Sequence, residues 1–321
     1  MKIKKILVTG SSGTIGTRLC EKLLEKGYVV VGADWKPNNW NGKINSLTVN
    51  VDLRNKEEVL KKLPKDADLI IHLAANARVY NLVVDPSLAR DNFETLFNVL
   101  EFARVNNIKK VMFSSSREVY GNSNKIVHTE DEAYVQNCES TYTASKIGGE
   151  ALVHAYHQCF GMDFVIFRFS NVYGMYDETD RLIPLFIKLC KEGKDLIVFG
   201  KEKLLDFTYV DDTIKGVIST IEQFDKVKNN VFNIAYGQGA SILEVAQIIK
   251  EFLKSNVNII LKENRTGEVV KYIADISKAK KDLNFNPETT IVEGIKKSIE
   301  WYNPFYDKKD NVKKIVKTPK E

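Results

Sequence analysis

The sequence predicts an α/β fold in which a doubly wound parallel sheet is joined to a smaller C-terminal α/β lobe. Strand and helix patterns alternate through the first half of the chain, which is typical of a parallel sheet with helices on both faces. A glycine-rich turn connects the first strand pattern to the first helix pattern. The 321 residues, of which 44% are hydrophobic, can bury one large core or two modest ones.

The predicted strands are short apolar runs at residues 3–9, 28–33, 47–51, 68–73, 110–115 and 163–169. After Phe169 the alternation ends, because a polar loop extends to Arg181 before a helix pattern begins near Leu182. We expect a sheet domain at 1–170 with returning segments near 205–236, a smaller lobe at 171–204 and 237–302, and a basic tail at 303–321.

The first strand leads directly into the glycine-rich turn, G-S-S-G-T-I-G at residues 10–16. Glycines at this spacing allow a tight bend, a close approach to a pyrophosphate and close helix packing, while the helix N-terminus offers free N–H groups. The turn therefore predicts a Rossmann domain that binds a dinucleotide. The residues that we expect at the cofactor are Gly10, Gly13, Thr14, Ile15 and Gly16.

The second predicted strand ends at Asp34. An acidic side chain at this distance from the glycine turn commonly binds the adenosine ribose diol. Because a carboxylate would repel a 2′-phosphate, Asp34 favours NAD over NADP as the cofactor. An Asp that simply faces solvent at a strand end is the alternative.

Tyr142 and Lys146 lie four residues apart in a helical pattern, so they share one face of a helix. Phenol titrates near ~10, and a nearby cation favours the phenolate. The pair is therefore a candidate acid/base centre that can take a proton from an alcohol. The same spacing also occurs on ordinary helix surfaces.

Composition argues against several other classes of protein. The net charge of +5 includes +3 from the last twenty residues, so the sequence predicts a solvated tail and no nucleic-acid binding. The four cysteines have no metal or disulfide spacing, and no apolar run could span a bilayer, so we expect a cytoplasmic protein with no membrane association. His154 and His157 lack a third ligand close by, and we predict no metal site.

Taken in order, these motifs resemble the extended short-chain dehydrogenase/reductase family, in its nucleotide-sugar epimerase and dehydratase branch. The resemblance covers residues 3–302. It is carried by the glycine turn, Asp34, V51-D-L, H72-L-A-A, Asn92, F113-S-S-S-R-E-V-Y-G, Y142-T-A-S-K, R168-F-S-N-V-Y-G, L182-I-P, D206-F-T-Y-V-D-D and R265-T-G-E.

The resemblance implies NAD as the cofactor and a set of further residues around it. Asp52 and Leu53 would border the adenine, and Asn92 would help to fix the dinucleotide. Lys146 would also bind the nicotinamide ribose. The other residues expected beside the cofactor are Leu73, Ala74, Ala75, Ser114 and Tyr142.

The same resemblance gives three side chains catalytic roles. Ser116 would hydrogen-bond a sugar hydroxyl, Tyr142 as phenolate would remove its proton, and Lys146 would favour the phenolate. The carbon-bound hydrogen would leave as hydride to NAD. Return of the hydride to the other face of the keto-sugar would invert that carbon, which is a 4-epimerase reaction.

Position 117 separates the reactions of this branch. The 4,6-dehydratases read Thr-Asp-Glu where this chain has Ser116-Arg117-Glu118, and a guanidinium cannot protonate a leaving hydroxyl. Glu118 matches a residue of the uronate decarboxylases and dehydratases, so a lyase stays the alternative. A non-catalytic NAD-sensing module is a third hypothesis, although all three catalytic side chains are present.

The substrate is expected to be a nucleotide sugar, most simply a UDP-sugar. Asn171, Ile183 and Arg265 match positions around the nucleotide, but Leu205 replaces the usual Arg before Asp-Phe. We also expect Arg78, Arg117 and Arg181 to converge on the active-site mouth, where with Glu118 they would contact the sugar. Guanidinium groups suit a C6 carboxylate, so we favour UDP-glucuronate and UDP-galacturonate over UDP-glucose and UDP-galactose. The alternatives for each arginine are binding of a phosphate, pairing with Glu118 or Asp180, and exposure to solvent.

Two apolar stripes predict helix faces, and the family resemblance implies that these helices form a homodimer. Phe93, Leu96 and Phe97 recur at helical spacing in one segment, and Tyr156 and Phe160 in another. In the family that the chain resembles, two such helices pair with their symmetry mates in a four-helix interface.

Overall fold

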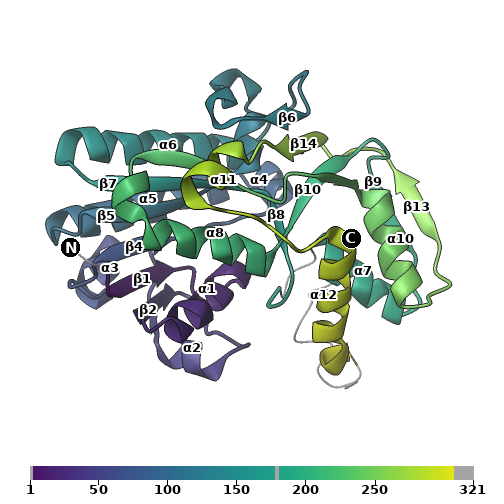
Figure 1. Cartoon of the computed structure of the whole chain (residues 1–321), viewed down its shortest axis with the longest axis horizontal. Helices are drawn as coiled ribbons and strands as arrows, with labels where there is room; N and C mark the ends of the chain where they lie inside the picture. The colour runs from purple at the N-terminus through teal and green to yellow at the C-terminus, as the bar shows by residue number, and fades with distance from the viewer. Residues whose placement is uncertain (1–2, 178–180, 307–321) are drawn as a thin grey trace.

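The computed structural model describes residues 3–177 and 181–306 and confirms the predicted α/β fold. Its largest element is a seven-stranded sheet with the order β11-β7-β5-β4-β1-β2-β3 (Figure 1). All its neighbouring strands are parallel. The strands are β1 (Lys5–Thr9), β2 (Val29–Asp34), β3 (Thr48–Asn50), β4 (Leu69–His72), β5 (Lys110–Ser116), β7 (Asp163–Phe169) and β11 (Asn230–Ile234), so the six strands predicted in the first half are confirmed.

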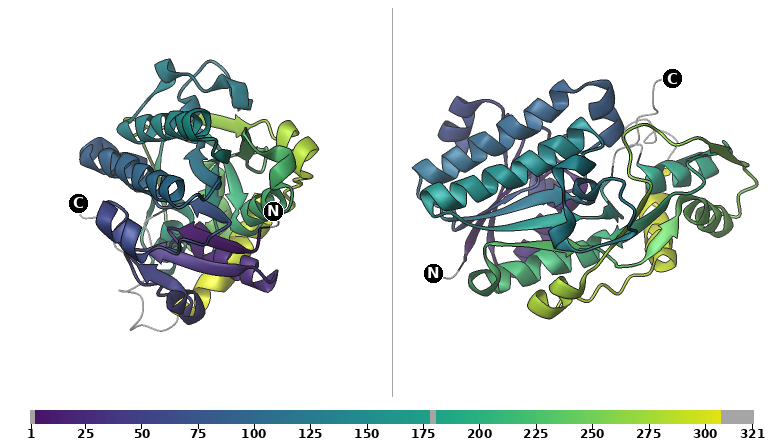
Figure 2. Two further views of the ribbon diagram at one scale, coloured as in Figure 1. Left: turned by 90° about the vertical axis from the view of Figure 1, so that its left-hand side faces the viewer. Right: turned by 90° about the horizontal axis from the view of Figure 1, so that it is seen from above.

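Helices cover both faces of this sheet. Side chains alternate between the faces along each strand, so Ile6 and Val8 of β1 enter one core and Leu7 enters the other. Figure 2 shows α5 and α6 side by side on one face, with α8 on the opposite face. The helices before the lobe and around the sheet are α1 (Thr14–Glu25), α2 (Gly42–Ser46), α3 (Lys56–Lys62), α4 (Val79–Val84), α5 (Ser87–Val105), α6 (Thr141–Phe160), α8 (Val210–Glu222), α9 (Phe224–Val227) and α11 (Ser277–Leu283).

The strand order reverses between β1 and β4. From β1 the chain builds β2 and β3 on one side, and it then returns to build β4, β5 and β7 on the other. The loops at the carboxyl ends of β1 and β4 therefore lead in opposite directions and leave a crevice between them.

The smaller lobe has two sheets of its own and three helices. Its larger sheet has the order β12-β10-β14-β6, with β8 also paired to β10, and its smaller sheet pairs β13 with β9. The strands are β6 (Val127–His128), β8 (Asn171–Tyr173), β9 (Leu196–Phe199), β10 (Leu204–Tyr209), β12 (Gly239–Ser241), β13 (Ile259–Lys262) and β14 (Lys271–Ala274), and the helices are α7 (Leu182–Lys191), α10 (Ile242–Phe252) and α12 (Ile291–Tyr306).

One expectation for the segment near 205–236 is wrong. β11 and α8 do return to the large sheet, but β10 pairs with β8, β14 and β12. The place beside β7 is taken by β11. β10 instead pairs with β8, the short strand that directly follows β7 in the chain.

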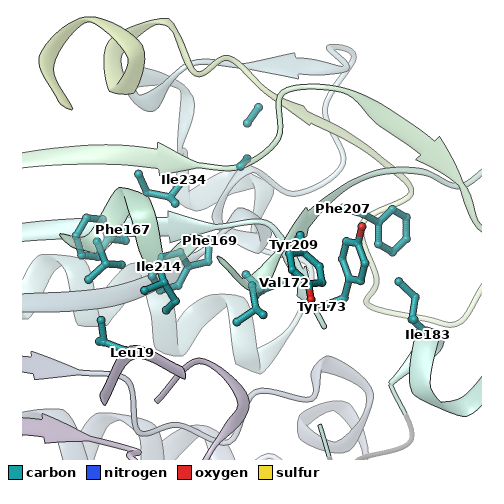
Figure 3. Close-up of a cluster of buried hydrophobic side chains, with 14 of the residues drawn as sticks. Leu19, Phe167, Phe169, Val172, Tyr173, Ile183, Phe207, Tyr209, Ile214 and Ile234 are labelled. Carbon is teal, nitrogen blue, oxygen red and sulfur yellow. The ribbon is translucent and has the colours of Figure 1, made fainter. Parts of the chain in front are cut away.

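A continuous hydrophobic core joins the sheet domain to the lobe. Figure 3 shows its members on both sides, including Leu19 of α1, Phe169 of β7, Tyr173 of β8, Ile183 of α7 and Phe207 of β10. The two parts therefore share one set of packed side chains.

The last described helix differs from the prediction at its end. Residues 303–306 were assigned to the tail by sequence, whereas α12 continues to Tyr306. Phe305 packs against Trp301, and the Tyr306 hydroxyl donates a hydrogen bond to the carbonyl of Pro184 at 3.3 Å. These contacts extend the helix, and the predicted tail from 307 onward lies outside the described residues.

Candidate active site

The glycine turn brings the backbone of β1 against the end of β4. Gly10 has a φ of +70°, and a Cβ there would lie 2.8 Å from the backbone nitrogen of Ala74. A Cβ on Gly16 would lie 2.0 Å from the carbonyl oxygen of Gly10. Only glycine fits at either position, and α1 can therefore begin directly above the turn.

A cleft of about 380 Å³ opens at this turn, on the carboxyl side of β1, β2 and β4. Most of the predicted cofactor residues line it: Gly10, Gly13, Thr14, Asp34, Asp52, Leu53, Leu73, Ala74, Ala75 and Asn92. Ile15 and Gly16 do not line the cleft. Ile15 packs against the hydrophobic core, and Gly16 contacts the turn itself.

The sequence analysis missed several residues of this cleft. Trp35, Trp40, Arg54, Asp91 and Tyr176 all line it. Trp35 and Arg54 could have been found, because each directly follows a predicted cofactor residue. Trp40 and Tyr176 carry no such local signal, since tertiary packing alone brings them to the cleft.

Asp34 is held in place by backbone N–H groups. Its Oδ2 accepts a hydrogen bond from the Ser12 N–H at 3.0 Å, and its Oδ1 accepts one from the Lys36 N–H at 2.9 Å. Burial raises the pKa of Asp34, although these hydrogen bonds oppose that effect. A carboxylate fixed at the cleft in this way can accept hydrogen bonds from a ribose diol.

Asp52 is engaged differently, because Arg54 binds it. The Arg54 Nη2 lies 2.7 Å from Oδ2 of Asp52, and its Nη1 lies 3.1 Å from Oδ2 of Asp91. The hydrogen bond from Arg54 lowers the pKa of Asp52. The same guanidinium lies over the Trp35 ring, 5.1 Å from its centre. Arg54 thus contacts Asp52, Asp91 and Trp35, which all line the cleft.

Asn92 fixes the loop after β4. Its Oδ1 accepts a hydrogen bond from the Asn76 N–H at 2.7 Å, and its Nδ2 donates to the Asn76 carbonyl and to Ser145 Oγ, both at 3.1 Å. The amide is used within the protein, so Asn92 shapes the cleft through the backbone at Asn76.

The three predicted catalytic side chains come together at the carboxyl end of β5. Ser116 ends β5, and Tyr142 and Lys146 lie on α6, where the Ser140 side chain caps the first turn. Ser116 is close enough to Tyr142 to lower the pKa of its hydroxyl, and the Lys146 Nζ donates to the Ser114 carbonyl at 2.8 Å. None of them lines the 380 Å³ cleft.

The electrostatics of this group differ from the simple sequence expectation. Burial has the largest effect on Tyr142 and raises its pKa, whereas the Ser116 hydrogen bond and the charges of Arg181 and Arg117 lower it. Burial also lowers the pKa of Lys146 to about 8. A phenolate at neutral pH therefore needs further positive charge beside the ring.

Arg117 and Glu118 form a buried ion pair next to this centre. The Arg117 Nη2 lies 2.7 Å from Oε1 of Glu118, and Nε donates to Oδ1 of Asn171 at 3.2 Å. Among the described residues, Arg117 Nη1 and Glu118 Oε2 are buried without a hydrogen-bond partner. Burial raises the pKa of Glu118, and the charge of Arg117 opposes this.

A second ion pair lies where the customary arginine is missing. Lys203 is buried and pairs with Glu268, while Leu205 itself is buried in the core. The charges of Lys203 and Glu268 both act on Glu118. The two ion pairs thus form one group of four charged side chains beside Asn171.

The remaining predicted substrate residues are dispersed. The Arg265 guanidinium lies between two rings, 4.0 Å from the centre of Phe199 and 5.1 Å from that of Tyr80. Arg78 precedes α4, and Arg181 Nε lies 3.7 Å from Oδ2 of Asp177.

Ile183 is a correction to the predicted site. Its side chain is 2% exposed and belongs to the hydrophobic core (Figure 3). Because the whole residue is buried, Ile183 does not present a surface to a ligand. The apolar run at the start of α7 serves packing.

The described ranges, 3–177 and 181–306, offer neither a cluster of metal ligands nor a membrane-spanning helix. No three His, Cys, Asp or Glu side chains there gather closely enough to hold a metal ion. None of the helices in these ranges is both long and apolar enough to cross a membrane.

Comparison with known proteins agrees with this geometry. The model of the NAD dependent epimerase/dehydratase family matches residues 6–235. A UDP-glucuronate 4-epimerase of Thermodesulfobacterium geofontis is 31% identical over 312 residues, covering 92% of this chain and 95% of that protein.

Solved structures are similar along the whole chain. The UDP-glucuronic acid 4-epimerase of Bacillus cereus, in complex with UDP-glucuronic acid and NAD, has a TM-score of 0.86 and 30% identity, covering 94% of this chain and all of that one. The UDP-glucose 4-epimerase of Thermotoga maritima with UDP-glucose has a TM-score of 0.83 and 28% identity, covering 94% and 99%. The predicted resemblance and NAD as cofactor are thereby confirmed, and the chain belongs to the NAD-dependent epimerase/dehydratase family.

Proposed function

We propose that the chain is an NAD-dependent UDP-sugar 4-epimerase and that its preferred substrates are UDP-glucuronate and UDP-galacturonate. The meeting of Ser116, at the end of β5, with Tyr142 and Lys146 of α6 carries the proposal of epimerisation. The Arg117 guanidinium, buried and with one nitrogen free of partners among the described residues, carries the proposal of a uronate. Relatives that act on glucuronate and on glucose are similar to this chain to nearly the same degree.

The proposed chemistry uses the protein groups as follows. Ser116 orients the C4 hydroxyl of the sugar, and Tyr142 removes its proton and later returns it. Bound NAD supplies the acceptor for the C4 hydride and the positive charge that lowers the Tyr142 pKa. Lys146, fixed to the Ser114 carbonyl, keeps an ammonium group 5.7 Å from the centre of the Tyr142 ring.

The cleft fits NAD in both shape and charge. A Cβ on Gly10 or Gly16 would collide with backbone, so the turn leaves room for a pyrophosphate at the start of α1. Asp34 presents a carboxylate for the ribose diol. Asp52 and Leu53 would border the adenine, and Lys146 would reach the second ribose.

The preference for a uronate rests on two arginines. The charges of Arg117 and Arg181 both lower the pKa of Tyr142, which supports a positively charged environment on this side of the site. The C6 carboxylate of a uronate is carried by C5, the ring carbon next to C4, and a charge-assisted bond to this carboxylate contributes roughly 1.5 to 3 kcal/mol. The sugar hydroxyls of UDP-glucose need no such charge.

The test is a product analysis with matched variants. Purified protein is incubated with UDP-glucuronate, UDP-glucose or UDP-N-acetylglucosamine, and the products are identified by NMR. We expect the highest kcat/KM for UDP-glucuronate, and a decrease of about tenfold to a hundredfold in Arg117→Ala or Arg181→Ala. Arg90→Ala is the control, because this side chain is 76% exposed on α5.

Other outcomes would favour other substrates. A wild type that prefers UDP-glucose, or arginine variants that keep the uronate preference, would leave a neutral-hexose epimerase. No turnover of any UDP-sugar would contradict the epimerase proposal itself.

A uronate decarboxylase is the second candidate, and Glu118 favours it. Its carboxyl has one oxygen without a hydrogen-bond partner in the described chain, and burial raises its pKa. The ion pair with Arg117 argues for a structural role instead. Release of carbon dioxide with accumulation of a UDP-pentose would identify this reaction.

We also propose a homodimer formed through α5 and α6. Phe93 and Phe97 of α5 and Phe160 of α6 are exposed on these two neighbouring helices. Burial of such rings in a symmetric interface would remove them from water. Sedimentation velocity is expected to give twice the chain mass, and Phe97→Glu is expected to give monomers.

A further inference from the structure

Four aromatic side chains from three separate parts of the chain meet at the edge of the cofactor cleft. Trp40 lies between β2 and α2, Tyr176 follows β8, and Trp301 and Phe305 lie on α12. The centre of the Trp301 ring lies 5.0 Å from that of Trp40, 5.2 Å from Tyr176 and 4.8 Å from Phe305. We call these four residues the aromatic cluster.

Only half of the aromatic cluster faces the cleft. Trp40 and Tyr176 line it beside Gly13 and Thr14, whereas Trp301 and Phe305 do not. The helix α12 therefore contacts this part of the cleft wall only indirectly, by packing against Trp40 and Tyr176. The centre of the Trp40 ring lies 5.6 Å from that of Phe305. Both α12 residues therefore pack against Trp40.

Hydrogen bonds connect the same parts to the helix that follows the glycine turn. The Tyr176 carbonyl accepts from Thr14 Oγ1 at 3.2 Å. Oε1 of Glu21, on α1, accepts from the Tyr176 hydroxyl at 2.8 Å and from Asn41 Nδ2 at 2.7 Å. The loop that carries Trp40, the segment that carries Tyr176 and α1 thus share one carboxylate.

The backbone at Tyr176 shows that these contacts hold it firmly. Its φ is +68°, in the left-handed region that a bulky side chain rarely adopts. Such a conformation persists when the surrounding contacts determine it. The contacts available to do so are the rings of the aromatic cluster and the bonds to Thr14 and Glu21.

Trp40 is positioned by packing. Its indole nitrogen is buried and has no hydrogen-bond partner among residues 3–177 and 181–306. Ring contacts, above all those with Trp301 and Phe305, therefore fix its place. Loss of Trp301 would leave the Trp40 side of the cleft without its main support.

We propose that Trp301 and Phe305 are positioning residues for NAD. Through Trp40 and Tyr176 they hold the cleft wall beside Gly13 and Thr14, and they slow the release of the cofactor. The need follows from the chemistry, because an epimerase must return the hydride that it has removed and cannot lose its cofactor between the two steps. The inference rests on the NAD-dependent family and on no particular sugar.

The test measures release of the cofactor directly. Full-length protein is loaded with NADH and mixed with excess NAD, and the change in NADH fluorescence gives the dissociation rate. We expect Trp301→Ala and Trp40→Ala each to release NADH about tenfold faster, since each loses aromatic contacts, and Trp301→Phe to stay near the wild-type rate. Phe252→Ala is the control, because that ring is exposed on α10 of the same lobe.

The double variant Trp40→Ala/Trp301→Ala tests whether Trp301 acts through Trp40. If it does, the double variant releases NADH no faster than the faster single variant. Rates that multiply in the double variant, or single variants within twofold of the wild type, would overturn the inference. If circular dichroism shows that Trp301→Ala does not fold, Phe305→Ala replaces it. Its NADH release rate is then measured alone and in combination with Trp40→Ala, and the same outcomes apply.

The result is separable from that for the proposed function. A wild type inactive toward every UDP-sugar would contradict the epimerase proposal but would leave the release rates meaningful. Unchanged release rates in an active epimerase would contradict only the role of Trp301 and Phe305.

Discussion

The ammonium group of Lys146 donates a hydrogen bond to the Ser114 carbonyl at 2.8 Å, which ties α6 to the carboxyl end of β5. Ser116 lies two residues farther along the same strand, and Tyr142 lies one turn before Lys146 on the same helix. Together with the hydrogen bond between Ser115 Oγ of the same strand and Glu150 Oε1 of the same helix, this bond helps to set the spacing between Ser116 and Tyr142.

Replacement of Tyr142 by Phe is expected to abolish turnover without loss of NAD. The hydroxyl is the proposed base, and loss of a positioned base costs about a hundredfold or more in rate. The ring stays in place, so the packing of α6 should not change. Epimerisation rate and NADH affinity are measured together, and activity near that of the wild type would remove Tyr142 from the mechanism.

Replacement of Asp34 by Asn is expected to lower the preference for NADH over NADPH by about tenfold or more. The carboxylate accepts from the ribose diol and repels a 2′-phosphate, and an amide does neither as well. Fluorescence titration with both cofactors gives the ratio of affinities. Asp66→Asn is the control, because this carboxylate pairs with Lys5 at the surface. An unchanged ratio would mean that Asp34 does not read the ribose.

Replacement of Gly16 by Ala is expected to abolish NAD binding or folding. The new Cβ would lie 2.0 Å from the Gly10 carbonyl oxygen, and the turn would have to move. Gly42→Ala is the matched control, since a Cβ at Gly42 has no neighbour within 4 Å. Thermal melts with and without NAD compare the two. A Gly16→Ala protein that binds NAD normally would contradict the tight packing of α1 on the turn.

Lys146 is expected to give activity and stability opposite responses to pH. Burial lowers its pKa to about 8 in the fold, from 10.5. Between these values the unfolded chain binds the proton and the folded chain does not, so the free energy of unfolding rises with pH. Activity should fall over the same range, because the neutral amine no longer favours the Tyr142 phenolate.

The control for this prediction is Lys146→Met, which has no group to titrate. Urea denaturation of NAD-free protein from pH 7.5 to 10.5 is compared in the two proteins. Stability curves that stay parallel would show that Lys146 keeps its proton in the fold.

Local sequence was enough to predict the elements that depend on neighbours in the chain. The glycine turn, Asp34 at the end of β2, and the four-residue spacing of Tyr142 and Lys146 are all short-range patterns, and backbone sterics and helix geometry determine what they form. The six strands of the first half were predicted for the same reason, since strand periodicity extends over only a few residues.

Only the tertiary structure decided which distant segments meet. β10 joins the lobe because β11 takes the place beside β7, and Ile183 is buried because α7 packs on the shared core. The contact of Arg117 with Asn171 and the meeting of Trp40 with Trp301 likewise depend on chain packing. A residue's own neighbours do not encode such contacts, because burial and charge pairing are properties of the packed molecule as a whole.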